Sequence, residues 1–189
     1  MEGYAWINES SAKWSGKDVS VTAPDKTDLF APLDGSDVVH SAPVYYREVT
    51  GDCVIRVKAA MKPHNKYDGA GIILYDDERH WVKGCSEVVD NGRSAAISVV
   101  TNGVSDDAIG PYVDRESIWL QVARKGEDFA VHFSLDGETF DLIRFCHVPM
   151  GRTVKAGLVA QAPLGEGGPR DFSQISIEER TLDDLRAGK

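Results

Sequence analysis

Short segments of β-branched and apolar residues, separated by turn residues, recur along almost the whole chain and constrain its fold more than any other feature. Residues 53–59 are a clear case, because valine and isoleucine there nearly alternate with polar side chains. This period of two is typical of half-buried strands. Similar patterns predict strands at residues 19–23, 44–48, 70–75, 81–86, 94–101, 117–124, 129–134, 142–148, 153–160 and 172–178.

Two dipeptides predict how neighbouring strands connect. Asn91-Gly92 favours a type I′ turn, because both central positions of that turn need a positive φ. Asp136-Gly137 gives a similar signal between residues 129–134 and 140–145. Both predict antiparallel hairpins. Many short strands with turns between them are typical of an all-β sandwich or jelly roll of antiparallel sheets, and no internal repeat indicates a propeller.

Helical patterns are scarce. Residues 181–186 alone look helical, with Thr181 as the N-cap and Asp184 at the capping-box position. We therefore expect a short C-terminal helix after the sandwich. A length of 189 residues fits a single domain over residues 1–189.

The charge balance argues against several partners. The chain has 30 acidic and 21 basic residues, for a net charge of −9, and no cluster of Lys and Arg compensates. Such a chain repels phosphate backbones, so we expect neither nucleic acid nor an anionic membrane as a partner. No stretch approaches the ~18 apolar residues of a membrane span.

The remaining composition indicates a cytoplasmic protein without a cofactor. Cys53, Cys85 and Cys146 are odd in number and far apart, which is typical of free thiols in a reducing compartment. Residues 1–3 lack the basic start of a signal peptide. The histidines show no tight ligand spacing, so we expect no metal site.

One row of side chains carries the chemistry. If residues 81–87 form a strand, Trp81, Lys83, Cys85 and Glu87 share one face, since side chains alternate with a period of two. A tryptophan, a cation and a carboxylate in one row are unusual for a core face.

Small residues on neighbouring strands leave space above this row. A hairpin closing at Asn91-Gly92 would place Ser94, Ala96 and Ser98 alongside it. On the preceding strand, the run from Gly69 to Gly71 again lacks bulk.

Two interpretations of this face stay open. In the first, it is a solvated outer face with a Lys83–Glu87 pair of little energetic value, and periodicity alone favours this view because exposed charges are the default. In the second, it is a concave ligand site. Tyr67 and Trp81 would then offer flat apolar surfaces, while Lys83, Glu87 and Asp68 would offer hydrogen bonds.

The same residues carry a family resemblance. Residues 67–75 and 81–87 resemble the signature of the domain of unknown function 1349 (DUF1349) family, which includes proteins named regulation of enolase protein 1. Further matching segments follow in order along nearly the whole chain: residues 98–101, 105–106, 119–124, 134–137, 154–158 and 161–163.

The resemblance implies a concanavalin A-like jelly roll with a concave face and no established reaction. It moves the balance toward a site that binds a carbohydrate or a small polar metabolite without catalysis. The residues expected to bind it are Tyr67, Asp68, Trp81, Lys83, Glu87, Thr101 and Asp106. Gly69 stands where the family usually has a glutamine, a difference that could change the ligand.

Two alternatives remain beside simple binding. A glycan-acting hydrolase would use Glu87 with a second carboxylate, supplied across strands by Asp68 or Asp106. Lys83 beside Glu87 would then depress the pKa of that carboxyl, which suits a nucleophile. The other alternative, implied by the family name, is a regulatory protein-binding module related to enolase regulation.

Overall fold

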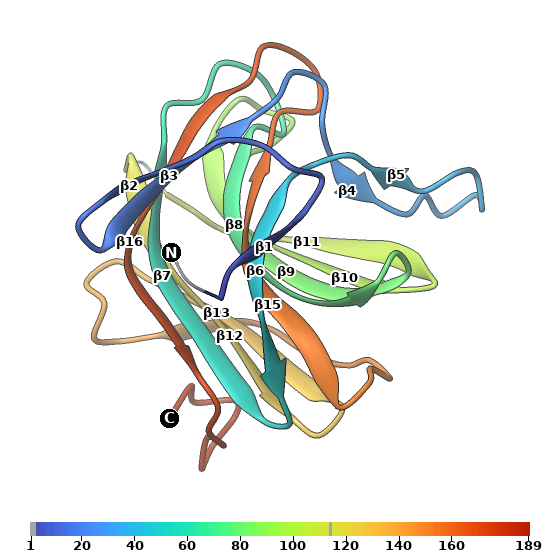
Figure 1. Ribbon diagram of the computed structural model, residues 1–189, viewed down its shortest axis with the longest axis vertical. Coiled ribbons are helices and arrows are strands. Elements are labelled where there is room, and N and C mark those ends of the chain that lie inside the picture. Colours follow the sequence, from blue (N-terminus) through green and yellow to red (C-terminus); the bar gives the residue numbers. More distant parts are fainter. Residues whose placement is uncertain (1–2, 114) are drawn as a thin grey trace.

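The computed structural model describes residues 3–113 and 115–189, which form two large antiparallel sheets packed face to face (Figure 1). The first sheet contains, in spatial order, β1 (Ala5–Ile7), β6 (Val44–Thr50), β15 (Thr153–Gln161), β8 (Gly69–Asp77), β9 (His80–Val88), β10 (Ser94–Asn102) and β11 (Val104–Tyr112). The second contains β14 (Asp141–His147), β13 (Asp128–Ser134), β12 (Ser117–Lys125), β7 (Cys53–Met61), β16 (Gly168–Glu178), β3 (Asp18–Ala23) and β2 (Ala12–Ser15). The predicted sandwich of antiparallel sheets is confirmed.

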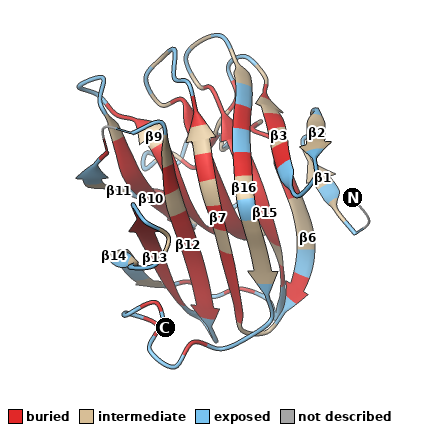
Figure 2. Ribbon diagram, turned by 90° about the vertical axis from the view of Figure 1, so that its left-hand side faces the viewer, coloured by how far each residue is buried: buried red, intermediate tan, exposed pale blue. Residues whose placement is uncertain are grey.

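The core lies between the sheets, where alternate side chains of both meet. Ile72 and Leu158 from the first sheet and Ile55 and Leu120 from the second are fully buried in one apolar cluster. Figure 2 shows this as buried segments along the facing strands, with exposed residues concentrated at the loops and edges. Period-two alternation in the sequence therefore identified the core strands for a physical reason, since one face of each is dry.

Sequence patterns missed several edge strands. β11 is one, because Asp106, Asp107 and Pro111 interrupt any alternation. Charges and proline are common on edge strands, where they discourage pairing with another chain. β1, β2 and the two-stranded ribbon of β4 (Leu29–Phe30) and β5 (Val39–His40) are also too short for a periodic signal.

The predicted C-terminal helix is wrong, since residues 181–189 contain no helix and only residues 185–188 form a turn. Asp184 does cap, because its Oδ1 accepts hydrogen bonds from the backbone N–H groups of Arg186 and Ala187. Leu182 and Leu185 are buried against the outer face of the second sheet. A helix of so few residues forms too few hydrogen bonds to offset the free-energy cost of its nucleation. The packing of the two leucines therefore determines the local conformation.

The β9–β10 hairpin corrects a second expectation, because its register differs by one residue. In the structure only Gly92 of the turn has a positive φ (79°), and Glu87 pairs with Ala95 and Cys85 with Ile97. A type I′ turn at Asn91-Gly92 would instead have brought Ala96 and Ser98 alongside. A one-residue shift exchanges the two faces of a strand, so Ala96 faces the core and Ile97 the outer face.

The segment between β3 and β6 covers part of the outer face of the first sheet. It carries β4 and β5, which project to one side in Figure 1. Leu29 and Ala42 from this segment form a second buried cluster with Ile73, Trp81 and Val159 of the sheet. The backbone of Ala31 also hydrogen bonds to Ser105 on β11. This covering leaves a pocket beside it.

Candidate functional site

The pocket, of about 330 Å³, lies on the outer face of the first sheet. We call it the Glu87 pocket. Its polar lining is Asp28, Tyr67, Lys83, Glu87, Asp90, Asp107 and Gln161, and its apolar lining is Phe30, Val89, Ile97, Val99 and Ile109. The volume is at the lower end of the ~300–1,000 Å³ range of small-molecule sites. Seven of the twelve lining residues are polar, which favours a small polar ligand over an apolar one.

Gln161 connects the two charged residues of β9. Lys83 Nζ donates to Gln161 Oε1 at 2.7 Å, and Gln161 Nε2 donates to Glu87 Oε2 at 3.1 Å. Nε2 also donates to the backbone oxygen of Tyr67 at 3.0 Å. The amide of Gln161 is thereby held in one orientation, and it fixes the distance between the ammonium and the carboxyl group.

Lys83 is buried, with 1% of its surface exposed. Its Nζ lies 5.5 Å from the ring centroid of Trp81 and also reaches the backbone oxygen of Leu29 at 3.4 Å. A buried ammonium needs such partners, because desolvation of an unpaired charge is costly. Both the covering segment and the sheet therefore supply contacts to the Lys83 ammonium.

Burial raises the pKa of Glu87 to about 7, even though Lys83 acts to lower it. Lys83 does lower this pKa, as expected, but the loss of hydration outweighs the attraction of the cation. The net pKa is therefore raised, and the depressed pKa that would suit a nucleophile is not found. Asp28 and Asp107 raise the same pKa further by repulsion. A carboxyl group that titrates near neutral pH can both accept and release a proton.

Tyr67 lines one side of the pocket, and its own backbone has an unusual conformation. Its φ is 66°, in the left-handed region that a bulky residue rarely adopts. Its N–H donates to the backbone oxygen of Val88, and its hydroxyl donates to Asp90 Oδ1 at 2.5 Å. Strain of this kind persists only where surrounding contacts enforce it, and it often accompanies binding sites.

Three of the residues expected from the sequence meet in the pocket: Tyr67, Lys83 and Glu87. Trp81 shares their face, as predicted, but it lies under the covering segment with no exposed surface. Its ring therefore supports Lys83 and is out of reach of a ligand.

The other expected residues lie outside the pocket lining. Asp68 is fully buried, where Oδ2 accepts the N–H groups of His64 and Asn65 and Oδ1 lies 3.7 Å from Arg170. Thr101 is buried and bonded to Ser105.

Asp106 is the third of these, and it pairs with Arg144 of β14 at 2.8 Å. Its neighbour Asp107 lines the pocket. Adjacent residues of a strand point to opposite faces, so only one of the two can line the pocket. The register, in which Asp107 pairs with the lining residue Val99, decides that it is Asp107.

Sequence reasoning also missed Asp28 and Gln161, although Gln161 lies in a segment that matches the family. Gln161 is the cross-strand partner of Gly69. A β-carbon on Gly69 would lie 2.9 Å from Cγ of Gln161. The glycine thus makes room for the side chain that bridges Lys83 and Glu87.

No group of three or more His, Cys, Asp or Glu side chains within residues 3–113 and 115–189 has the arrangement of a metal site. The described part of the chain likewise has no helix long and apolar enough to cross a membrane. The three cysteines are free thiols, as expected.

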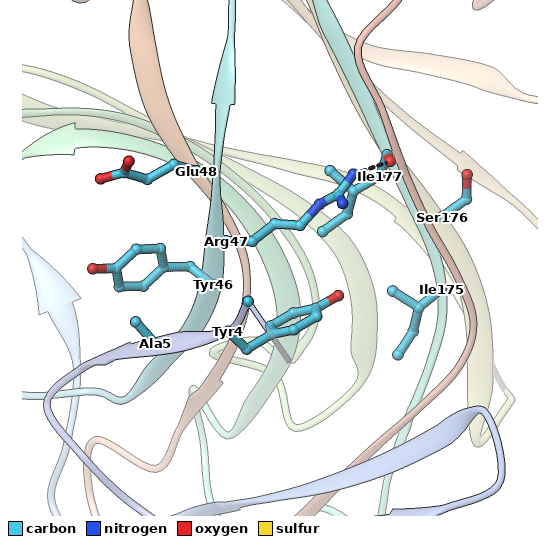
Figure 3. Close-up of a pocket in the computed structure, with 9 residues that line it drawn as sticks. Tyr4, Ala5, Tyr46, Arg47, Glu48, Ile175, Ser176 and Ile177 are labelled. Atoms are coloured by element: carbon cyan, nitrogen blue, oxygen red, sulfur yellow. Dashed lines mark hydrogen bonds between the residues drawn. The ribbon is translucent and has the colours of Figure 1, made fainter. Parts of the chain in front are cut away.

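A larger hollow of about 790 Å³, which we call the Arg47 hollow, opens between the β1–β6 side of the first sheet and β16 of the second. Gly3, Tyr4, Ala5, Tyr46, Arg47, Glu48, Ile175, Ser176 and Ile177 line it. Figure 3 shows Arg47 reaching from β6 to the backbone oxygen of Ile177 on β16, at 2.5 Å. This contact joins a strand of the first sheet to a strand of the second.

The two antiparallel sheets, packed face to face, give the chain a concanavalin A-like jelly-roll fold. The chain belongs to the family described as "Protein of unknown function (DUF1349)", whose model matches residues 6–180. This confirms the resemblance seen in the sequence.

Similar proteins agree with this assignment. The chain is 27% identical over 175 residues to "Regulation of enolase protein 1" of Saccharomyces cerevisiae, covering 91% of our chain and 87% of that protein. A crystal structure of a functionally unknown protein from Saccharomyces cerevisiae matches with a TM-score of 0.88 and 26% identity, covering 95% of our chain and 98% of the other. Carbohydrate binding module CBM66 from Bacillus subtilis matches with a TM-score of 0.60 and 10% identity, over 94% and 96%. At that identity the last likeness concerns the fold alone.

Proposed function

We propose that the protein binds a carbohydrate or another small polar metabolite in the Glu87 pocket, without transforming it. The observation that carries this proposal is the convergence of Lys83, Gln161, Glu87 and Tyr67 over apolar walls in a cavity of about 330 Å³. Hydroxyl groups of a sugar would bond to the carboxyl oxygens, and its C–H faces would pack on Phe30 and the other apolar lining residues.

The fold supports the same proposal. A carbohydrate binding module shares the sandwich, although fold alone does not establish function. Tyr67 and the β4–β5 segment, which border the pocket here, would determine which ligand is accepted, because loops on a rigid scaffold commonly set specificity.

A thermal-shift screen against sugars, polyols and small polar metabolites tests this function, with calorimetry on each hit. We expect Glu87→Gln to weaken binding at least about tenfold, because a charge-assisted hydrogen bond becomes a neutral one. Glu138→Gln is the matched control, because it removes the same charge from an exposed residue on the β13–β14 turn. A screen with no saturable binding would count against the proposal.

A hydrolase is the second candidate, and the raised pKa of Glu87 is the observation that favours it. Asp28 and Asp107 line the same pocket and replace Asp68 and Asp106 as candidates for the second carboxylate. Turnover of chromogenic glycosides that disappears in Glu87→Gln would support hydrolysis. Binding without turnover on a broad glycoside panel would leave the non-catalytic role.

The name of the yeast relative suggests a third role, in which the protein acts on another protein. Purified enolase from the organism that produces this protein is the partner to test first, by calorimetry with the full chain. Saturable binding that persists in Glu87→Gln would place such a partner outside the pocket, whereas absence of binding would leave small-ligand binding as the function to pursue.

A further inference from the structure

The hydrogen-bond donors of the Glu87 pocket are directed to protein acceptors. Lys83 Nζ donates to the oxygen atoms of Gln161 and Leu29, and both hydrogen bonds of Gln161 Nε2 go to protein oxygens. The hydroxyl of Tyr67 donates to Asp90. Few donors are left for an incoming ligand.

Acceptors are in excess. In the part of the chain that the structure describes, Asp28 Oδ1 accepts from Leu29 N–H and Asp90 Oδ1 accepts from the Tyr67 hydroxyl. Glu87 Oε2 accepts from Gln161 Nε2 and from the Cys85 thiol. The second oxygen of each carboxyl group and both oxygens of Asp107 have no such partner within residues 3–113 and 115–189. The pocket therefore presents lone pairs to a ligand.

The charges of the pocket favour the same kind of ligand as its hydrogen-bond acceptors do. Four carboxyl groups line the pocket with one ammonium, that of Lys83, which is buried and already paired. Asp28 and Asp107 line the same pocket as Glu87, and their repulsion disfavours its ionised form. An anionic ligand would add to this repulsion, whereas a cation would relieve it.

We propose that the Glu87 pocket selects a polyhydroxylated ligand that carries an amine, such as an amino sugar, over the neutral parent sugar, and that it rejects the corresponding sugar acid. This inference rests on the proposed binding function and names its ligand class. An ammonium group only donates hydrogen bonds, and its bonds to carboxylates are charge-assisted. A sugar acid brings acceptors and negative charge to a site that already has both.

The test compares matched probes by calorimetry at pH 7.0 with the full chain. D-glucose, D-galactose and D-mannose are each titrated as the neutral sugar, as the 2-amino-2-deoxy sugar and as the 6-carboxylate. For the parent that binds best, we expect the amino sugar to bind about fivefold more tightly than the neutral sugar. The 6-carboxylate should bind about tenfold more weakly than the amino sugar or show no binding.

Asp107 and Asp106 provide the paired variants. Asp107→Asn should weaken the amino sugar several times more than the neutral sugar, because it removes one negative charge from the rim. Asp106→Asn removes the same charge one residue away, on the opposite face of β11, where Arg144 holds it. This control should leave the preference for the amino sugar unchanged.

The outcomes separate the two claims. Sugar acids that bind as tightly as amino sugars would overturn the charge preference and leave the binding function in place. Equal effects of Asp107→Asn and Asp106→Asn would also overturn it. No binding by any of the probes, together with no hit in the wider screen, would overturn the binding function itself.

Discussion

Gly69 and Gln161 face each other across β8 and β15, so close that a β-carbon on the glycine would lie 2.9 Å from Cγ of the glutamine. Gln161 bridges Lys83 to Glu87 at 2.7 and 3.1 Å. The glycine is thus a condition for the central hydrogen bonds of the pocket, and not a neutral gap in a strand.

Gly69→Ala should therefore displace Gln161 and lower the free energy of unfolding by about 1–3 kcal/mol, the usual range for overpacking. Urea denaturation measures the loss. In the double variant with Gln161→Ala the space is free again, so we expect the two effects to be non-additive by about 1 kcal/mol. Additive effects would show that the two side chains do not interact.

Glu87 should make stability depend on pH. Its pKa in the folded protein is about 7, above the ordinary 4.5. A raised carboxyl pKa contributes stability that is fully present below the unfolded value and is lost as pH rises through the folded value.

The free energy of unfolding should accordingly fall by about 2 kcal/mol between pH 5 and pH 8 from this group, a figure reduced because Glu87 is partly exposed. Glu87→Gln should flatten that part of the curve and stabilise the protein at pH 8. The same curve for wild type and variant would show that Glu87 titrates normally.

Trp81→Ala should destabilise the protein by about 3–5 kcal/mol, because the ring is fully buried in the cluster with Leu29, Ile73 and Val159. Thermal denaturation gives the comparison. A variant that keeps the wild-type melting temperature but loses ligand binding would show that the ring is accessible and stacks on the ligand.

Arg47→Met should cost about 1.5–3 kcal/mol, since it leaves the carbonyl of Ile177 without its charged donor. Arg152 is exposed, and Arg152→Met is the matched control. Equal stability of the two variants in urea would contradict the role of Arg47 in joining the sheets.

The thiols should be inert. Burial raises the pKa of Cys53 to about 12 and that of Cys146 to about 11, and it raises the pKa of Cys85 well above its ordinary value. Thiolate is the reactive form, so alkylation at pH 7.5 should be slow until denaturant is added. Rapid labelling of one cysteine in the folded protein would refute this.

The sequence allowed the sandwich to be predicted because alternation reports directly on a strand with one dry face, as in residues 53–59. It allowed Lys83 and Glu87 to be placed together for the same reason. Their neighbours depended on the turn at Gly92, where one residue of register decides which face is which.

Gln161, Asp28 and Asp107 could not be predicted in the same way. They come from three elements that meet only in the folded chain: β15, the covering segment and an edge strand without alternation. Burial of Trp81 likewise depends on that covering segment, whose strands β4 and β5 are too short for a pattern.

The most direct measurement is an NMR titration of the ¹⁵N-labelled protein with the best ligand of the sugar panel, following the side-chain amide of Gln161 and the backbone amides of β9, β10 and β11. The account predicts saturable shifts centred on Gln161, Glu87, Val99 and Asp107, with none around the Arg47 hollow. Shifts confined to Arg47 and its neighbours, or no saturable shift at the Gln161 amide, would contradict it.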